Sequence, residues 1–175
     1  MNRKALPLSQ VYRLLEPGPV AMVSTAHAGR LNVMTMSWLT MMEFEPPLLG
    51  CVIGSLNYSF GLLQKSRECV INIPTVEIAR QMAGCGSCSG RRVDKFEQFG
   101  LTPLPAARVA APLIAECYAN LECRIADARL VRKYNFFVLL VLRAWIDPAR
   151  KRPRLIFYRG DGEYMLAGRA FAVPS

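Results

Sequence analysis

The stretch from Asn32 to Ser59, NVMTMSWLTMMEFEPPLLGCVIGSLNYS, combines two strand-like apolar runs with short polar and aromatic side chains near the end of each run. These side chains are Thr35, Ser37, Trp38 and Thr40 in the first group, and Ser55, Asn57, Tyr58 and Ser59 in the second. Hydroxyl and amide groups beside aromatic rings suit a polar ligand that also has a flat apolar face. The stretch therefore predicts a ligand site, most simply a cofactor site, where two strands end.

Two simpler interpretations stay open for the same residues. Asn57 and Ser59 precede a helical apolar pattern, so they could do no more than cap a helix, although a helix start also favours phosphate. Trp38 considered alone is more often a core residue than a ligand contact.

The segments around this stretch predict further strands. Residues 19–25, PVAMVST, and residues 31–38, LNVMTMSW, flank the turn His27-Ala28-Gly29-Arg30, which is typical of a β-hairpin. Residues 48–53, LLGCVI, form a continuous apolar run that is typical of a buried strand. On the N-terminal side, residues 8–15, LSQVYRLL, have the apolar spacing of a short helix.

The second half of the chain continues the β-rich pattern. Strands are predicted over 68–73, 113–130 and 136–146, and a final turn and strand over 160–166. A short helix over 76–83 is expected to run into a flexible glycine-rich loop over 84–90, and an amphipathic turn over 93–100 ends at a glycine. Mostly strands with a few short helices indicate a mainly β, Greek-key-type barrel, formed by one domain over 1–175.

Composition limits the class of protein. With 52% hydrophobic and 20% charged residues the chain is not disordered, and it has neither an apolar run of about 18 residues nor a secretory signal. A soluble, cytoplasmic protein without membrane attachment is expected. The apolar excess in a chain of 175 residues favours a homodimer, because dimer interfaces resemble a core cut in half.

The net charge of +9 raises the question of nucleic acid. The 22 Lys and Arg residues are spread through predicted strands and turns, without aromatic interleaving, zinc-finger spacing or a recognition helix. No nucleic-acid partner is therefore expected. A basic surface also attracts phosphorylated cofactors.

The cysteines and the single histidine do not predict a metal site. Of six cysteines, four lie within apolar strand patterns, where cysteine acts as a small hydrophobe. Cys85-Gly-Ser-Cys88 is a lone CxxC without a second pair or a neighbouring histidine, and His27 lies in a turn. A redox dithiol stays an alternative, but no catalytic role is predicted for Cys85 and Cys88.

Common catalytic motifs are also missing from the sequence. There is no GxGxxG after a first strand, no Walker A motif, no GxSxG and no paired-carboxylate cluster. Chemistry without a recognisable acid, base or nucleophile favours a bound cofactor as the reactive group, and a flavin fits this description.

The order of several motifs resembles the flavin reductase-like family of FMN-binding split barrels, particularly its flavoredoxin-like branch. The motifs are 19–25 with Gly29, Asn32, Ser37-Trp38, Thr40, Pro46-Pro47, Asn57-Tyr58-Ser59, 70–74, Ser89-Gly90 with Asp94-Lys95-Phe96, and Gly160-Asp161-Gly162-x-Tyr164. The resemblance spans nearly the whole chain. It implies a split β-barrel, a homodimer, FMN near the dimer interface, and hydride exchange between a nicotinamide and the flavin.

The resemblance also implies a set of cofactor-binding residues. Those near the flavin and its ribityl chain are Asn32, Thr35, Met36, Ser37, Trp38 and Thr40, with the strand beside the ring at Cys51, Val52, Ile53, Gly54 and Ser55. Those near the phosphate are Asn57, Tyr58 and Ser59, with Arg91 and Lys95 as charged partners. Where family members commonly carry an Asp-His pair before the late strand, this chain reads Lys133-Tyr134-Asn135. The resemblance therefore implies no nicotinamide contact at that position.

Three hypotheses of function follow. The first is an NAD(P)H:flavin oxidoreductase in which NADH or NADPH reduces FMN by direct hydride transfer to flavin N5, with no catalytic side chain, serving a downstream monooxygenase or electron-transfer protein. The second is a flavoredoxin-type carrier that holds FMN tightly and takes electrons from a protein partner, docked through basic residues. The third is a nucleic-acid or haem-binding module on the same barrel.

Overall fold

The computed structural model describes residues 18–169 and 171–173. Its strands are β1 (Gly18–Pro19), β2 (Ala21–His27), β3 (Arg30–Met36), β4 (Leu39–Glu43), β5 (Leu48–Val52), β6 (Glu68–Ile73), β7 (Pro103–Leu104), β8 (Leu113–Ile114), β9 (Ala119–Asp127), β10 (Phe136–Ile146), β11 (Ile156–Gly160) and β12 (Glu163–Leu166). Its helices are α2 (Tyr58–Ser66), the 3-10 turn η2 (Val76–Ile78), α3 (Ala79–Ser87), α4 (Lys95–Gln98) and α5 (Val131–Tyr134). The helix predicted over 8–15 lies outside the described residues.

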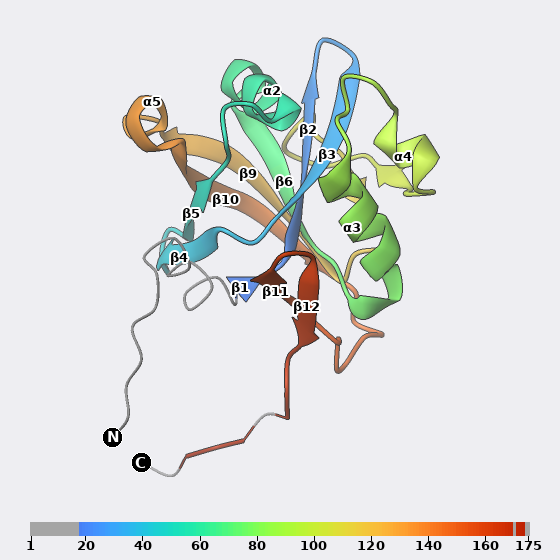
Figure 1. Ribbon diagram of the computed structural model, residues 1–175. Coiled ribbons are helices and arrows are strands. Elements are labelled where there is room, and N and C mark those ends of the chain that lie inside the picture. Colours follow the sequence, from blue (N-terminus) through green and yellow to red (C-terminus); the bar gives the residue numbers. More distant parts are fainter. Residues whose placement is uncertain (1–17, 170, 174–175) are drawn as a thin grey trace, which may run out of the picture.

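A seven-stranded antiparallel sheet, in the order β3-β2-β6-β9-β10-β5-β4, forms the body of the protein (Figure 1). The predicted hairpin is confirmed: β2 pairs with β3 from Ala21 opposite Met36 to His27 opposite Arg30. Its turn takes positive φ at Ala28 and at Gly29. The strands predicted over 68–73 and 136–146 are confirmed as β6 and β10.

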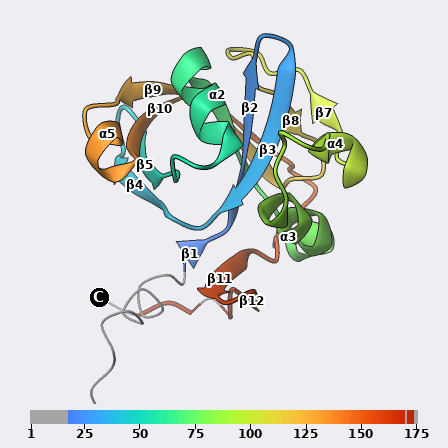
Figure 2. The same cartoon turned by 45° about the horizontal axis from the view of Figure 1, so that its top comes forward.

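Strand β2 is buried on both faces, which explains its continuous apolar sequence. Ala21 and Val23 face one core cluster, together with Leu63 of α2. Met22 faces a second cluster, together with Met82 of α3 and Phe96 of α4. Figure 2 shows α2 over one part of the curled sheet and α3 and α4 on the other side of the β2–β3 hairpin. The short helices are therefore peripheral and close two separate cores.

A smaller three-stranded sheet, in the order β1-β11-β12, lies beside the main one (Figure 2). It places Gly18 opposite Tyr158 and Tyr158 opposite Tyr164. The β11–β12 turn takes positive φ at residues 160–162, as the predicted final turn requires. In the described part of the chain, no helix is long and apolar enough to cross a membrane.

The prediction of a flexible loop over 84–90 is wrong for residues 84–87, because α3 continues to Ser87. Packing explains why helix-weakening glycines are kept there. A side chain at Gly84 would overlap the ring of Phe99, and one at Gly86 would lie 3.3 Å from the Thr35 Cβ atom. The two glycines therefore allow α3 to pack closely on α4 and on β3.

Candidate functional site

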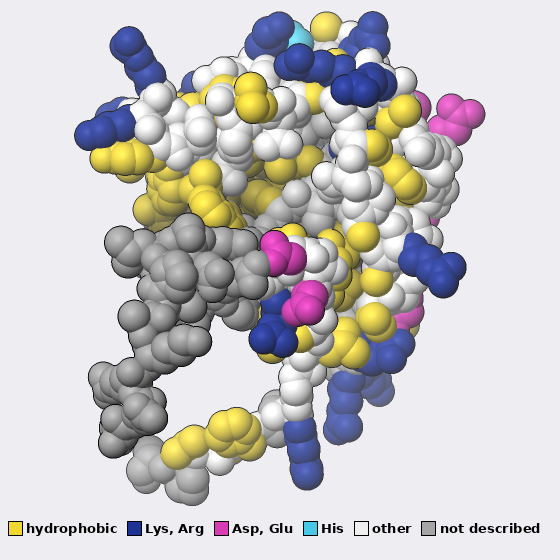
Figure 3. All heavy atoms as spheres, viewed as in Figure 1, with side chains coloured by type: hydrophobic (Ala, Val, Ile, Leu, Met, Phe, Trp, Pro, Cys, Tyr) yellow, Lys and Arg dark blue, Asp and Glu magenta, His cyan; other side chains and the backbone are white. Residues whose placement is uncertain are grey.

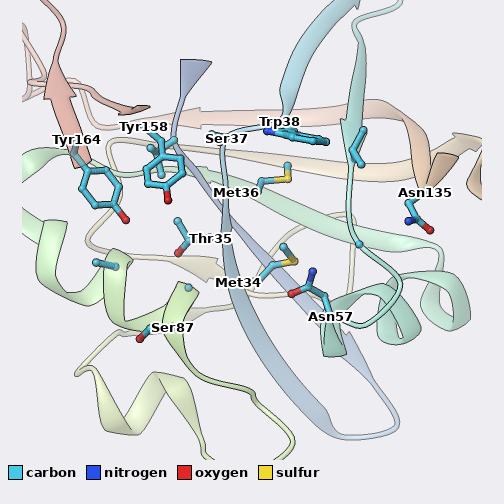
Figure 4. A pocket seen from close by; sticks show the side chains of 15 residues that line it. Met34, Thr35, Met36, Ser37, Trp38, Asn57, Ser87, Asn135, Tyr158 and Tyr164 are labelled. Carbon is cyan, nitrogen blue, oxygen red and sulfur yellow. The ribbon is translucent and has the colours of Figure 1, made fainter. Parts of the chain in front are cut away.

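A cavity of about 600 Å³ lies between β3, the β5–α2 connection, the C-terminal half of α3 and the β11–β12 hairpin (Figure 4). Its lining residues come from seven separate segments of the chain. They are Val20, Met34, Thr35, Met36, Ser37, Trp38, Val52, Gly54, Asn57, Ala83, Gly86, Ser87, Asn135, Tyr158 and Tyr164. We refer to this cavity as the central pocket.

Aromatic rings stand on two sides of the central pocket. Tyr158 and Tyr164 lie together at one end in Figure 4, with ring centroids 5.1 Å apart, and Trp38 lies towards the other end. Trp38 keeps 53% of its surface exposed, which is high for tryptophan. The thioether side chains of Met34 and Met36 lie between these aromatic groups (Figure 4). The pocket therefore offers flat and deformable apolar surface.

Hydroxyl and amide groups supply the polar part of the lining. Thr35 donates its hydroxyl hydrogen to the Met82 carbonyl oxygen at 2.5 Å, which ties β3 to α3. The side chains of Ser37, Asn57 and Asn135 make no hydrogen bond to another described residue, so they are available to a ligand.

The central pocket carries little charge. None of its described lining residues is Asp, Glu, Lys, Arg, His or Cys. Burial, and next the neighbouring Tyr158, raises the pKa of the Tyr164 phenol, so this group stays protonated at neutral pH. The lining can orient a ligand and exclude water, but it presents no group that would act as a strong base near pH 7.

Helix α2 begins beside the central pocket without a side-chain cap. Asn57 occupies the N-cap position but makes no capping hydrogen bond, so capping does not account for this residue. The Ser59 hydroxyl instead accepts a hydrogen bond from Asn32 Nδ2 at 2.8 Å. The first turn contains no acidic residue. Its free N–H groups therefore favour an anion at this end of the helix.

Asn32 and Gly90 make a close contact next to the start of α2. Asn32 Oδ1 is buried without a hydrogen-bond partner in the described structure, and a Cβ atom at Gly90 would overlap it. The Arg91 guanidinium lies over the Tyr58 ring, 5.6 Å from its centroid. The segment after Gly90 thus brings a positive charge to the start of α2.

The structure brings seven of the predicted site residues to the central pocket and places the others around it. The seven are Thr35, Met36, Ser37, Trp38, Val52, Gly54 and Asn57. Strand alternation turns Cys51 and Ile53 into the core instead. Thr40 and Ser55 are exposed and line no part of the central pocket. Tyr58 and Arg91 line a neighbouring hollow, and Asn32 and Ser59 are buried beside the helix start.

Lys95 does not reach the central pocket. It is 4% exposed, and its ammonium group donates to the carbonyl oxygens of Val33 at 2.8 Å and of Cys85 at 2.6 Å. Burial lowers its pKa, and the two carbonyl groups accept from two of the three ammonium N–H donors. In this structure Lys95 holds the 85–95 segment against β3.

Several lining residues were not among the predicted site residues. They are Val20, Met34, Ala83, Gly86, Ser87, Asn135, Tyr158 and Tyr164. Met34 follows from strand periodicity, since it shares a face with Met36. The two tyrosines flank a Gly-Asp-Gly turn that the sequence marks, but no local pattern shows that this hairpin folds back onto β3.

Cysteine and acidic residues do not gather near the central pocket. Within residues 18–169 and 171–173, no group of three or more His, Cys, Asp or Glu residues could hold a metal ion. All six cysteines are free thiols. Burial raises the pKa of Cys85 to about 12, while Cys88 is half-buried and donates to the Gly84 carbonyl oxygen.

Comparison with known proteins gives matches of sequence and of fold. The sequence profile of the flavin reductase like domain matches residues 13–165. An uncharacterized protein of Archaeoglobus fulgidus is 36% identical over 107 residues, which make up 61% of this chain and 60% of that protein, less than two thirds of its length.

Two solved structures show the same fold. The FMN-binding domain of a flavin reductases-like enzyme from Shewanella baltica is 28% identical, with a TM-score of 0.83 over 98% of this chain and 97% of that one. The flavoredoxin of Desulfovibrio vulgaris (Miyazaki F) is 22% identical, with a TM-score of 0.87 over 99% and 97% of the two chains.

The solved structures confirm the predicted fold class, a mainly β split barrel with short peripheral helices. The family profile extends from before β1 into β12, so it includes every segment that lines the central pocket. The chain belongs to the flavin reductase-like domain family.

Proposed function

We propose that this chain binds FMN in the central pocket and acts as an NAD(P)H-dependent flavin oxidoreductase. The observation that carries the proposal is the continuity of the site. An uncharged pocket with aromatic walls leads, through Ser37 and Asn57, to the uncapped start of α2. A flavin mononucleotide has the matching sequence of parts, which are a flat ring, a hydroxylated chain and a phosphate.

The residues present fit this cofactor. Trp38, Met34 and Met36 offer apolar surface for a planar ring, and the free side chains of Ser37 and Asn57 suit ribityl hydroxyl groups. For the phosphate, the first turn of α2 offers backbone N–H groups without a competing acidic side chain. Arg91 brings a positive charge to this helix start through its contact with Tyr58. The FMN-binding structure from Shewanella baltica supports the same cofactor class.

Bound FMN would supply the reactive centre, which accepts a hydride from NADH or NADPH at flavin N5. The chain's own residues position the reactants and exclude water. Tyr158 and Tyr164 form a wall opposite Trp38, and their rings, tilted by 50° to each other, offer apolar surface to a second planar group. Because the lining holds no strong base or nucleophile, catalysis would rest mostly on this positioning.

Anaerobic titration of the FMN-loaded protein with NADH and with NADPH tests this function. The proposal predicts that at least one nicotinamide bleaches the visible flavin band within seconds, and that free FMN as acceptor sustains turnover. A flavin band that stays unchanged for minutes with both nicotinamides would contradict the reductase activity, even where FMN itself binds.

A flavoredoxin-type electron carrier is the second candidate, and Asn135 favours it. This residue lines the central pocket in the segment where the resemblance would place a histidine. Without that histidine, a nicotinamide loses one contact near the flavin. The carrier hypothesis predicts tight FMN binding and no oxidation of NADH or NADPH. It also predicts rapid reduction by a reduced acidic protein such as a ferredoxin, with a rate that falls as salt is added.

A further inference from the structure

The motif Cys85-Gly86-Ser87-Cys88 lies at the C-terminal end of α3, beside the central pocket. Its two middle residues, Gly86 and Ser87, line that pocket, and Figure 4 shows Ser87 on the last turn of α3. The two cysteines flank this part of the lining in sequence. The function proposed above needs neither thiol, so a separate role for the pair can be considered.

The two thiols of the motif differ in exposure. Cys85 is 1% exposed and packs in the second core cluster, together with Met82 and Phe96. Cys88 is half-buried, follows the last residue of α3, and donates to the Gly84 carbonyl oxygen at 3.5 Å. A dissolved oxidant therefore reaches the Cys88 sulfur more readily than the Cys85 sulfur.

The spacing of the two cysteines suits a bond between them. Residues three apart on an α-helix are neighbours on its surface, with Cβ atoms about 5–6 Å apart. A disulfide needs Cβ atoms about 3.5–4.5 Å apart, so a small approach is enough. Cys88 has left the helix, with φ −129° and ψ 166°, and it can approach Cys85 without unwinding α3.

The ammonium group of Lys95 lies at the same end of α3. It donates to the carbonyl oxygens of Cys85 and Val33, which leaves one ammonium N–H without an acceptor among the described residues. No described carboxylate pairs with it, and its charge interacts electrostatically with both thiols of the motif. A positive charge beside a thiol favours the thiolate, the form that attacks peroxides.

We propose that Cys85 and Cys88 form a peroxide-reactive thiol pair, in which oxidation of Cys88 leads to a Cys85–Cys88 disulfide. The Cys88 thiolate first attacks one oxygen of hydrogen peroxide, the O–O bond breaks, and the leaving oxygen takes up protons and departs as water. The Cys85 sulfur then displaces the hydroxyl group of the Cys88 sulfenic acid, which leaves as a second water with the Cys85 thiol proton. In total the two thiols lose two electrons and two protons, and the peroxide gains them.

Hydrogen peroxide is the expected oxidant because reduced flavins form it when they react with O₂. Only for this source of peroxide does the inference rest on the proposed function, which would release the oxidant beside Ser87. No step of flavin reduction is assigned to either thiol. Added peroxide replaces the flavin as the source in the test, so each proposal can fail without the other.

Peptide mass mapping of the full-length protein after treatment with a small excess of hydrogen peroxide tests the inference. Trypsin cuts after Arg80 and Arg91, so both cysteines of the motif fall in one peptide, residues 81–91. The remaining thiols are alkylated in denaturant before digestion. We expect this peptide to carry two alkyl groups without peroxide. With peroxide it should carry none and be about 2 Da lighter than the unmodified dithiol peptide. The four cysteines outside the motif should stay reduced and alkylated in both samples.

Three variants separate the roles of the two thiols. Cys85→Ala removes the second thiol, so sulfenic acid should accumulate on Cys88, where dimedone traps it. Cys88→Ser should form no disulfide and leave Cys85 reduced. Cys117→Ala replaces another buried cysteine of the same core cluster, and as the matched control it should form the Cys85–Cys88 disulfide as the wild type does.

Two results would overturn the inference. A wild-type peptide that keeps both thiols, or that carries stable sulfenic or sulfinic acid on Cys88, would show that the two sulfurs do not join. A disulfide from Cys88 to any other cysteine, in the same chain or in a second one, would also refute the pair. Formation of the Cys85–Cys88 disulfide by a protein that binds no FMN would remove the proposed function and support this inference.

Discussion

Strand alternation divides the segment 51–55, which the resemblance assigns to the cofactor as one block. Val52 and Gly54 line the central pocket, whereas Cys51 and Ile53 are packed in the core. The sequence could predict that this strand is buried, but not which face meets the ligand, because both faces are apolar. For Trp38 the sequence left core and ligand contact open. The structure places its half-exposed ring in the wall of the pocket.

Replacing Trp38 by alanine should weaken FMN binding about tenfold, because one aromatic contact contributes roughly 1 to 1.5 kcal/mol beyond its buried area. Titration of the protein with FMN, followed by flavin fluorescence, measures the change. Trp145→Phe, at the other tryptophan, lies outside the central pocket and should bind FMN as the wild type does. Equal affinities for Trp38→Ala and wild type would remove Trp38 from the site.

Glu122 is a buried carboxylate that stabilises the fold away from the site. It accepts hydrogen bonds from Trp145 Nε1 at 2.6 Å and from the backbone N–H groups of Ala107 and Arg108. Glu122→Gln should lower the free energy of unfolding by about 1–3 kcal/mol, because an amide N–H₂ group would face these donors. Urea denaturation measures the loss, and the exposed Glu97→Gln should cost almost nothing.

The same carboxylate makes the stability of the fold depend on pH. Desolvation raises the pKa of Glu122, but the hydrogen bonds from Trp145, Ala107 and Arg108 outweigh it, so the pKa lies below its ordinary value of 4.5. The ionised form therefore stabilises the fold above that value, and its contribution is lost as the pH falls through the lowered pKa. The wild type should lose more stability than Glu122→Gln between neutral and acidic pH. Parallel losses in the two proteins would contradict this assignment.

At the scale of secondary-structure elements, helix α3 differs from what its local sequence predicts. Gly84 and Gly86 lie close together and predict a loop, yet both are helical. A Cβ atom at Gly84 would overlap the Phe99 ring, and one at Gly86 would lie 3.3 Å from the Thr35 Cβ atom. These contacts join segments that lie far apart or across a turn, so no local window of the sequence contains them. The main strands, in contrast, could be predicted closely, because their apolar runs are long and bounded by turns.

Substitutions at two helical glycines, Gly84 and Gly61, test this account of helix packing. Gly84→Ala should destabilise the protein by about 1–3 kcal/mol, because its methyl group overlaps the Phe99 ring. Gly61→Ala on α2 should stabilise it by about 0.5–1 kcal/mol, because the methyl group meets open space and the unfolded chain loses freedom. Thermal or urea unfolding measures both changes. The same sign for the two variants would contradict the packing described for α3.

At the level of the whole molecule, the central pocket closes only when distant parts of the chain meet. Tyr158 and Tyr164 come from the last hairpin and complete a wall that begins more than a hundred residues earlier, at Val20 and Met34. The sequence marks the hairpin and its turn but not its docking partner. This is the reason why the predicted site includes the β3 and β5 side of the pocket and lacks the opposite wall.

Exposed apolar side chains near β4 support the expected homodimer as a proposal. Phe44 is 89% and Leu56 is 95% exposed, and Met41 and Met42, close to Phe44 in sequence, are 53% and 48% exposed. Figure 3 shows apolar side chains gathered below α5, on the same side of the molecule as β4 and β5 in Figure 1. Exposed apolar side chains in this number on one side of a molecule are typical of a subunit interface.

Light scattering coupled to size-exclusion chromatography tests this proposal. We expect the wild type to have the mass of two chains and Met42→Asp/Phe44→Asp to shift towards one chain, because two charges would be buried at the interface. Phe171→Asp, at an exposed residue of the C-terminal segment, is the control and should stay a dimer. A wild type with the mass of one chain at micromolar concentration would contradict the dimer.

The central claim is that FMN binds in the central pocket, and one titration tests it most directly. Adding FMN to purified protein should give saturable 1:1 binding, with loss of flavin fluorescence and quenching of the tryptophan emission. The quenching should be largely lost in Trp38→Phe, because Trp38 lines the pocket and Trp145 does not. Unchanged flavin fluorescence at tens of micromolar protein, or equal quenching in wild type and Trp38→Phe, would contradict the account.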